Sequence, residues 1–211
     1  MAVITITRQY GAGGSRVARL VAERLGWTVI DNEFVSEVSR LAGLPPEAVA
    51  AREERAPSLL ELLGRALAIS APELFVPAAT PEAGPDEEAL IRVTQRVIAE
   101  AAAHGRVVLV GHGAHAYLGG PRDAPDSLHA YVVAPREVRA RTIAERDALA
   151  PHEAAHKVDA VDRGRERYLE RYYQRRRDDA ATYHLVVNTA WLGYEGAAEL
   201  IVEAARKRRL V

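Results

Sequence analysis

Five short apolar segments rich in β-branched residues alternate with longer segments of helical periodicity, and this alternation restricts the possible folds most. The strand candidates are residues 2–7 (AVITIT), 27–31 (WTVID), 106–111 (RVVLVG), 127–134 (SLHAYVVA) and 183–188 (YHLVVN). Helical spacing covers residues 15–25, 86–104, 135–149, 151–177 and 194–208, with a proline-broken helical pattern over 32–69. Strands that alternate with helices form a parallel sheet covered on both faces. The sequence therefore predicts the α/β class with a five-stranded parallel sheet.

The length and composition favour a single domain. A chain of 211 residues, of which 48% are hydrophobic, can bury a sizeable core. The formal charge of -1 argues against a general electrostatic grip on a nucleic-acid polymer. The N-terminus has no leader pattern, and no apolar run approaches the roughly 18 residues that a membrane span needs. We expect a cytoplasmic protein, and residues 73–79 (ELFVPAA) are the first candidate for a contact in a homo-oligomer.

Residues 7–16 (TRQYGAGGSR) follow the first strand directly and are rich in glycine. Closely spaced glycines let backbone N–H groups turn inward around an anion, and the following helix N-terminus adds partial positive charge. The dinucleotide pattern GxGxxG begins with Gly11 and Gly13 but has Arg16 at its last glycine. The Walker pattern GxxxxGK[ST] fits Gly13 and Ser15 but has Arg8 at its first glycine and Gly14 in place of its lysine. The pattern alone allows a phosphate-binding loop or a structural strand-to-helix turn.

Five separated stretches of the sequence together resemble the cytidylate kinase-like family. They are ITITRQYGAGGSRVARLVAERLGWTVIDNEFV, VVLVGHGAHAYL, LHAYVVAPREVRARTIAERD, VDRGRERYLERYY and YHLVVNTAWLGYEGAAELI. This family is a branch of the nucleoside monophosphate kinases, and its SRQYGSGG-like loops replace the Walker lysine. The resemblance implies a P-loop NTPase-like, three-layer α/β/α domain over residues 1–211. It also implies an acceptor-binding helical region near residues 44–86 and a helical lid near residues 150–177.

The resemblance further implies a chemical activity. A kinase of this kind transfers a phosphoryl group from ATP, with Mg²⁺, to a nucleoside monophosphate of the cytidylate type or to a similar small acceptor. Two alternatives stay open: a nucleotide-binding protein without turnover, and a kinase of an unrelated small molecule. The missing lysine, and His112 where the family has an arginine, are compatible with lost catalysis.

The candidate residues for binding the phosphates of ATP are Gly11, Ala12, Gly13, Gly14, Ser15 and Arg16. If lysine is missing from the loop, its charge must come from elsewhere, because phosphoryl transfer depends on cations around the transferring group. Arg8 is favoured over Arg16, since a charged residue at the carboxyl end of a buried strand points towards the cleft. Ser15 stands where the Walker serine or threonine binds magnesium, which makes it the candidate Mg²⁺ ligand.

Two candidates for binding the acceptor follow the second and third strands. Asp31 stands where nucleoside monophosphate kinases place a polar or acidic residue near the acceptor nucleotide, and could orient or deprotonate it. Its alternative role is to cap the next helix. His112, in GHGAH, replaces an arginine of the family's GRG-like sequence, and so keeps a donor but loses the permanent charge. His115 is interpreted as a histidine on a helix surface.

The arginine-rich segment after residue 150 predicts the cations of the lid. Arg163, Arg165 and Arg167 are the candidate catalytic arginines, because a lid of this family brings arginines over the phosphates and excludes water. On a helix Arg163 and Arg167 share one face, as do Tyr168 and Tyr172. Arg146, which ends the preceding helix, is the candidate for stacking on the donor base.

One motif in the same region points to a different chemistry. Residues 152–156 (HEAAH) match the zinc-protease pattern HExxH, and on a helix His152 and His156 would face the same way. The extended pattern requires glycine where Asp159 stands, and the segment lies within the arginine-rich lid. We therefore do not expect a zinc hydrolase.

Overall fold

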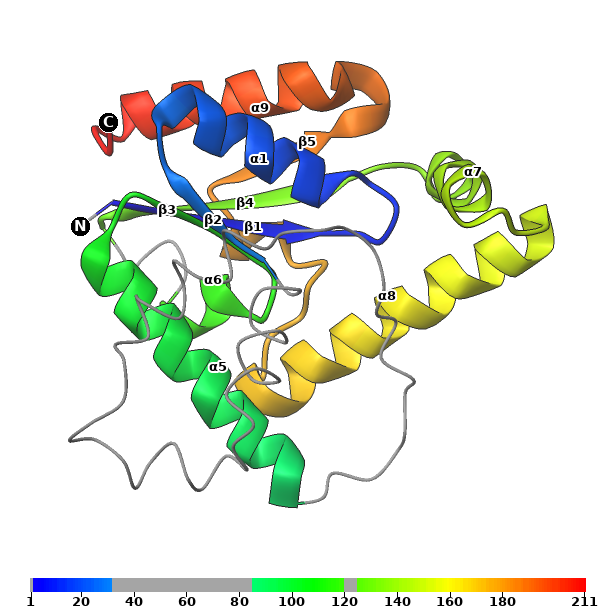
Figure 1. The fold of residues 1–211 in the computed structure, drawn as a ribbon, viewed down its shortest axis with the longest axis horizontal. Helices are drawn as coiled ribbons and strands as arrows, with labels where there is room; N and C mark the ends of the chain where they lie inside the picture. Colours follow the sequence, from blue (N-terminus) through cyan, green and yellow to red (C-terminus); the bar gives the residue numbers. More distant parts are fainter. Residues whose placement is uncertain (1, 32–84, 120–124) are drawn as a thin grey trace.

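The computed structural model describes residues 2–31, 85–119 and 125–211. Its centre is a five-stranded sheet of β1 (Val3–Arg8), β2 (Thr28–Ile30), β3 (Val107–Val110), β4 (Ser127–Val133) and β5 (Leu185–Asn188), as Figure 1 shows. The strand order is β2-β3-β1-β4-β5, and all neighbouring strands are parallel. All five predicted strands are therefore confirmed, and the carboxyl ends of β1, β3 and β4 lie at the same edge of the sheet.

Helices cover both faces of this sheet. On one face lie α1 (Gly14–Leu25) and α9 (Thr189–Lys207), and on the other lie α5 (Pro85–His104), α6 (Ala114–Tyr117) and α8 (Pro151–Tyr173) (Figure 1). Helix α7 (Arg136–Asp147) packs against α8 beyond the carboxyl edge, around the buried side chains of Ile143, Ala154 and Val158. The predicted three-layer α/β/α arrangement is confirmed.

The alternating sequence of β1 explains how the central strand contributes to both faces. Ile4 and Ile6 are fully buried in the apolar core beneath α1 and α9. Thr5 and Thr7 belong to the opposite face, where each hydroxyl makes a hydrogen bond with a buried histidine, His129 for Thr5 and His115 for Thr7. These hydrogen bonds satisfy the buried hydroxyl groups, as buried polar groups require. On this face of the sheet, polar side chains of β1 and β4 are therefore part of the buried interior.

The end of α1 agrees with the sequence, whereas the end of α8 and the start of α9 differ from it. Gly26 adopts the left-handed conformation and closes α1 as predicted. Helix α8 ends at Tyr173 rather than near residue 177, because Gln174 is left-handed with φ 51°. Helix α9 begins at Thr189 instead of near residue 194: the Asn188 side chain accepts a hydrogen bond from Ala190 N, and Gly193 (φ 64°, ψ 178°) breaks the helix afterwards.

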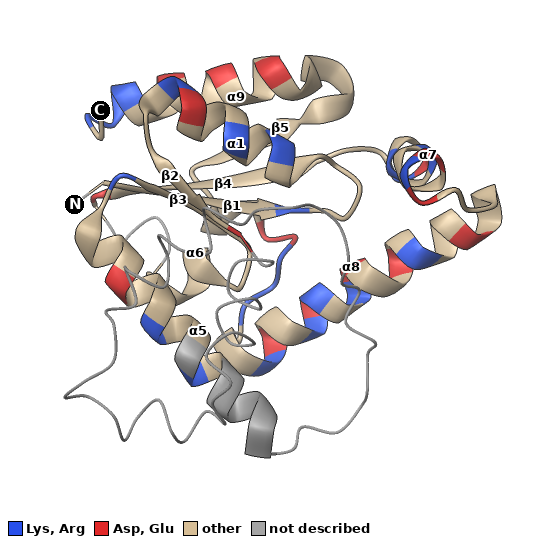
Figure 2. Cartoon of the chain, in the orientation of Figure 1, with Lys and Arg blue, Asp and Glu red and all other residues tan. Residues whose placement is uncertain are grey.

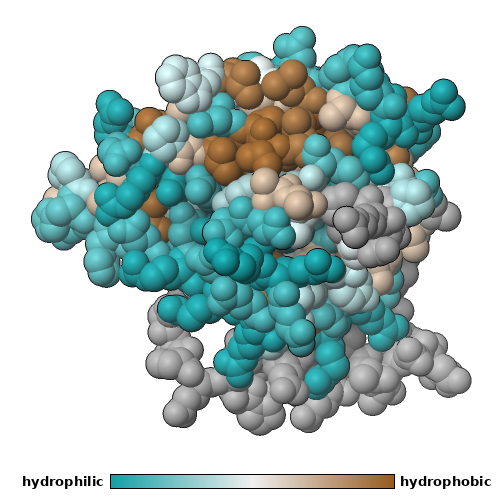
Figure 3. Space-filling model, turned by 180° about the vertical axis from the view of Figure 1, so that it is seen from behind, coloured by the Kyte–Doolittle hydropathy of each residue, from teal (hydrophilic) through white to brown (hydrophobic). Residues whose placement is uncertain are grey.

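One side of the molecule carries a broad hydrophobic area, seen from behind in Figure 3. Exposed apolar side chains on β5 and α9 include Val186, Trp191, Leu192 and Leu200. Strand β5 is also an outer strand of the sheet. In the described part of the chain, no helix has the length and apolar character needed to cross a membrane. The predicted acceptor-binding region, most of residues 44–86, and the suggested subunit contact at 73–79 lie outside the described residues.

Candidate active site

The glycine-rich loop lies between β1 and α1, at the carboxyl edge of the sheet where ligands of such folds bind. Gly11 (φ 81°) and Gly13 (φ 77°) are left-handed, a conformation that glycine adopts without steric cost. The first N–H groups of a helix have no intrahelical acceptor. Within the described residues, the amides of residues 13–16 donate no hydrogen bond. The loop therefore offers a set of N–H groups to an anion.

Two neighbouring elements, α7 and α9, pack closely against the loop. A Cβ atom on Gly11 would lie 2.8 Å from the carbonyl oxygen of Arg139, and one on Gly13 would overlap the ring of Tyr194. The hydroxyl of Thr189, at the start of α9, donates a hydrogen bond of 2.9 Å to Ala12 O. The loop is thus fixed by α7 and α9 as well as by β1, and its amides are held in place before any ligand binds.

A buried ion-pair network connects the loop to α7 and α8. Asp162 of α8 accepts hydrogen bonds from Tyr10 N at 3.0 Å, Arg139 Nη1 at 2.6 Å and Arg177 Nη1 at 2.7 Å. Arg139 also donates to Tyr10 O and to Ala134 O. The two arginines and Asp162 are each less than 9% exposed. Both ion pairs of Asp162 are therefore largely shielded from water. The network therefore joins the middle of α8, the predicted lid helix, to the glycine-rich loop.

Of the three predicted lid arginines, the structure brings Arg165 to the loop. Its Nη1 donates a hydrogen bond of 3.2 Å to Arg8 O, and its guanidinium lies 5.5 Å from the centre of the Tyr10 ring. Arg163 and Arg167 are exposed on α8. Figure 2 shows how basic and acidic residues alternate along this helix. The i,i+4 spacing did predict the contact between Tyr168 and Tyr172, whose ring centres are 5.2 Å apart.

Arg146 and Tyr10 form a second contact at the loop. The guanidinium of Arg146 lies 5.4 Å from the centre of the Tyr10 ring, and its Nη2 donates to Tyr10 Oη at 2.6 Å. Arg146 also pairs with Asp147, and this hydrogen bond lowers the pKa of Asp147 to about 2 and raises the pKa of Arg146. The side chain of Tyr10 therefore contacts two guanidinium groups, those of Arg146 and Arg165.

Arg16 points to a different neighbour. It is exposed on α1, and its guanidinium lies 5.7 Å from the centre of the Tyr194 ring. Arg8, by contrast, is 9% exposed at the end of β1. The two arginines that flank the loop in sequence thus have different environments, and the buried one belongs to the strand.

The two acceptor candidates lie at the carboxyl ends of neighbouring strands. Asp31 is half-buried directly after β2, and His112 follows β3, which pairs with β2. His112 is left-handed (φ 52°) between two left-handed glycines, Gly111 and Gly113. Such a conformation is uncommon for a residue with a side chain and concentrates at functional sites. Tyr173 fixes this turn from α8: its hydroxyl donates to His112 O at 3.4 Å.

The interpretation of His115 as a surface residue was wrong. His115 is 2% exposed, because the short helix α6 turns this side chain towards β1, where Nδ1 lies 3.0 Å from Thr7 Oγ1. Its ring stacks on that of Tyr183 with the centres 4.8 Å apart. Burial, with a smaller contribution from the positive charge of Arg175, lowers the pKa of His115 to about 4. His115 is therefore a neutral core residue beside the site.

Protonation of His115 is expected to make stability depend on pH. The folded protein keeps this histidine neutral down to about pH 4, whereas the unfolded chain binds the proton near the ordinary histidine pKa of 6.5. Between these values the unfolded state binds more protons, so the free energy of unfolding should fall by up to about 3 kcal/mol as pH decreases. Urea denaturation at several pH values should show this slope reduced in His115→Gln and retained in His152→Gln. An unchanged slope in His115→Gln would contradict the expectation.

The histidines of the HEAAH motif are exposed on the first turns of α8. Glu153, between them, accepts a hydrogen bond from Ala150 N at 3.0 Å and so stabilises the start of the helix. Among the described residues, no cluster of three or more histidine, cysteine, aspartate or glutamate side chains could hold a metal ion. In the structure, the glutamate of this motif therefore caps the N-terminus of α8.

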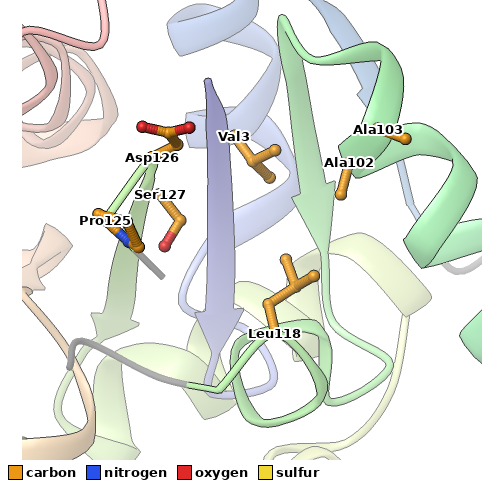
Figure 4. A pocket seen from close by; sticks show the side chains of 7 residues that line it. All are labelled: Val3, Ala102, Ala103, Leu118, Pro125, Asp126 and Ser127. Atoms are coloured by element: carbon orange, nitrogen blue, oxygen red, sulfur yellow. The ribbon is translucent and has the colours of Figure 1, made fainter. Parts of the chain in front are cut away.

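A hollow of about 320 Å³ lies far from the loop, and Figure 4 shows the side chains around it. Val3 and Ser127 place it at the amino ends of β1 and β4, opposite the edge that carries the glycine loop. Its wall is mainly apolar, with Asp126 as its charged residue. We place the active site at the loop because N–H groups and guanidiniums converge there, as the binding of phosphate requires.

Several residues of the site were not identified from the sequence. They are Tyr10, Asp162, Arg139 and Arg177. One pattern could have indicated Asp162: in α8 the buried residues Ala154 and Val158 recur at i,i+4 spacing, and the next position in this series is Asp162. A carboxylate on the buried side of an amphipathic helix needs a paired cation. The identity of those cations could not be derived from spacing along α8.

The amino-acid sequence matches the cytidylate kinase-like family over residues 3–190. It is similar to a cytidylate kinase of Ignicoccus hospitalis, with 31% identity over 202 residues that cover 95% of this chain and 97% of that protein. It is also similar to a cytidylate kinase of Sulfolobus acidocaldarius, with 37% identity over 84 residues, or 39% of this chain and 46% of that protein.

Solved structures have the same fold at low sequence identity. An uncharacterized protein from Eubacterium ventriosum gives a TM-score of 0.70 at 17% identity, covering 98% of this chain and 99% of that chain. A shikimate kinase from Acinetobacter baumannii gives a TM-score of 0.51 at 16% identity, covering 100% of this chain and 96% of that chain. These likenesses confirm the P-loop kinase type of α/β fold. The match over residues 3–190 and the 31% identity to the Ignicoccus hospitalis protein show that the chain belongs to the cytidylate kinase-like family.

Proposed function

We propose that this protein transfers the γ-phosphoryl group of ATP to a nucleoside monophosphate of the cytidylate type. The observation that carries this proposal is the loop itself. The N–H groups of residues 13–16 have no acceptor in the described part of the chain, and they lie at a helix N-terminus next to the buried Arg8 and the guanidinium of Arg165. Phosphoryl transfer depends mainly on positioning and on neutralising the charge of the transferring group. Both requirements are served by groups that converge at this edge of the sheet.

The residues divide between donor and acceptor. The amides of Gly13, Gly14 and Ser15 would bind the phosphates of ATP, while Arg8 and Arg165 would neutralise the charge that develops during transfer. The N–H of Ala12 already donates to Gln9 O at 3.2 Å. Asp31 would orient or deprotonate the acceptor, and His112 would donate a hydrogen bond to its phosphate. Arg163 and Arg167 would contribute only after a movement of α8, because both are exposed. The covalent chemistry takes place between the two substrates, and no protein intermediate is needed.

The residues present fit one magnesium ion bound together with ATP. Mg²⁺ commonly takes one or two protein ligands and completes its coordination with phosphate oxygens and water. Ser15, half-buried in the first turn of α1, would supply a hydroxyl ligand at the position expected from the Walker pattern. The ion would supply positive charge at the phosphates of ATP, and Arg8, Arg165 and the loop amides would add theirs.

Two measurements test this proposal. Isothermal titration calorimetry should detect binding of ATP in the presence of Mg²⁺, and ADP release should be fastest with cytidine monophosphate among nucleoside monophosphates and small alcohols. Binding of ATP without turnover on any acceptor would favour a non-catalytic nucleotide-binding protein. Turnover on a small alcohol but on no nucleotide would favour a kinase of another substrate class. Failure to bind ATP would exclude all three functions.

A further inference from the structure

The side chain of Arg8 occupies the space in which a side chain at position 14 would begin. Gly14 is buried, and a Cβ atom built on it would lie 2.5 Å from Arg8 Cβ, 2.7 Å from Arg8 Cγ and 3.4 Å from Arg8 Cδ. Real Cβ contacts essentially never fall below 3.0 Å. Residue 14 therefore cannot carry a side chain while Arg8 keeps this position.

The backbone alone does not explain why residue 14 is glycine. Gly11 and Gly13 have positive φ values, but Gly14 is the first residue of helix α1 and has no such conformation. In a helix, glycine is less favourable than alanine by up to about 1 kcal/mol. The feature that requires glycine here is the close contact with Arg8, so residues 8 and 14 are sterically coupled.

This coupling involves the position that bears the lysine of an ordinary P-loop. The Walker pattern has its lysine directly after the glycine that corresponds to Gly13, where this chain has Gly14. That lysine and Arg8 would start in the same space, so a loop of this shape can contain one of them but not both. Arg8 brings a permanent positive charge to the same turn of α1, from β1 instead of from the helix.

The other arginines near the loop are directed to other groups. Arg16 is exposed and lies over Tyr194, while Arg146 is bound to Tyr10 Oη and Asp147. Arg165 donates to Arg8 O, and therefore lies on the β1 side of the loop, next to Arg8 rather than in its place. Arg8 alone among these four fills the space of residue 14.

We propose that Arg8 is the catalytic cation of this loop in place of the Walker lysine, and that residue 14 is glycine because the stem of Arg8 passes through its side-chain space. The inference rests on the proposed phosphoryl transfer and names the residue that supplies its missing charge. An arginine at this position differs from a lysine, because its planar guanidinium can bind two phosphate oxygens at once.

A set of four variants tests the proposal: Arg8→Ala, Arg8→Lys, Gly14→Lys and the double variant Arg8→Gly/Gly14→Lys, in which glycine also removes the Cβ of residue 8. Arg8→Ala should lower kcat by about 10²–10³-fold, the effect typical of removing one group that stabilises transition-state charge. Arg8→Lys should recover part of this loss. Gly14→Lys alone should lower the melting temperature and abolish turnover, since two stems compete for one space. Arg19→Ala, on the exposed side of α1, is the matched control and should behave as wild type.

The double variant is the decisive protein. It should melt at a higher temperature than Gly14→Lys and turn over at least about tenfold faster than Arg8→Ala. With neither the Cβ nor the stem of residue 8 present, a lysine in the Walker position has room and replaces the charge. Additive losses in both measurements would overturn the proposal, as would wild-type kcat and ATP affinity in Arg8→Ala.

Failure of the proposed function gives a different result. If the wild type binds ATP with Mg²⁺ but does not turn over, phosphoryl transfer is excluded, and the assignment of a catalytic role to Arg8 fails with it. The steric coupling would still be visible as a higher melting temperature and higher ATP affinity of the double variant relative to Gly14→Lys. If turnover is normal and the coupling is absent, the proposed function stands and the inference about Arg8 is wrong.

Discussion

Asp162→Ala is expected to lower the free energy of unfolding by about 3–5 kcal/mol, the usual effect of removing one partner from a buried ion pair. The substitution leaves Arg139 and Arg177 buried without the carboxylate that binds both, at 2.6 Å and 2.7 Å. It also removes the acceptor of Tyr10 N. In the intact network, the attraction between the charges is largely offset by the cost of removing them from water. The loss of stability in the variant therefore arises mainly from the two buried arginine charges that no longer have a carboxylate partner.

Urea denaturation of the purified variants measures this loss. Asp178→Ala is the matched control: it removes a carboxylate that pairs with Arg176 at 2.9 Å, but both side chains are more than half exposed. It should change the free energy of unfolding by less than about 1 kcal/mol. Asp162→Asn provides a second variant, since it keeps an acceptor for Tyr10 N and removes the charge alone. A loss below about 1 kcal/mol in both Asp162 variants would contradict the role assigned to the network.

Arg165→Ala is expected to reduce kcat by about 10³-fold, within the range found for arginines that stabilise the transition state of phosphoryl transfer. Arg165 is the arginine of α8 that contacts the loop, through Arg8 O and the Tyr10 ring. The expected change lies in kcat rather than in KM for ATP, since the loop amides that would bind the ground-state phosphates are unaffected.

Steady-state kinetics with the best acceptor of the panel separates the two parameters. Arg141→Ala, an exposed arginine of α7, is the control for a general loss of positive charge and should keep the kcat of the wild type. Thermal unfolding of Arg165→Ala should be measured in parallel, because the side chain also packs against the loop. A variant that keeps its melting temperature and its kcat would remove Arg165 from the catalytic residues.

The fold could be predicted to a large extent from the sequence. β-branched runs such as residues 106–111 and helical periodicities such as residues 86–104 are local patterns, and the structure has β3 and α5 at these places. Strand order follows less directly from the sequence: β3 inserts between β2 and β1, although β1 and β2 are neighbours along the chain. The boundaries of α9 also differed, because the cap at Asn188 and the break at Gly193 were not identified.

The candidate site was predictable where a short motif contains the chemistry. The glycine loop, its helix and the arginine-rich helix were identified from composition and spacing, whereas Asp162 and Tyr10 were not, because these two residues are separated by 152 positions. His115 was misplaced for a similar reason. Its surroundings are set by Thr7, 108 positions away, and by Tyr183, and nothing adjacent to it in the sequence indicates burial.

The sequence by itself determined the elements: which segments are strands and helices, where the glycines permit left-handed turns, and that a basic helix follows the fourth strand. These properties depend on backbone preferences and periodicities that extend over a few residues. Only the tertiary structure decided which arginines reach the loop. Arg165 and not Arg163 or Arg167 contacts it, and the stem of Arg8 excludes a side chain at residue 14. Such contacts depend on how the strand, the loop and the helices are placed in three dimensions, because close packing admits one side chain in each space.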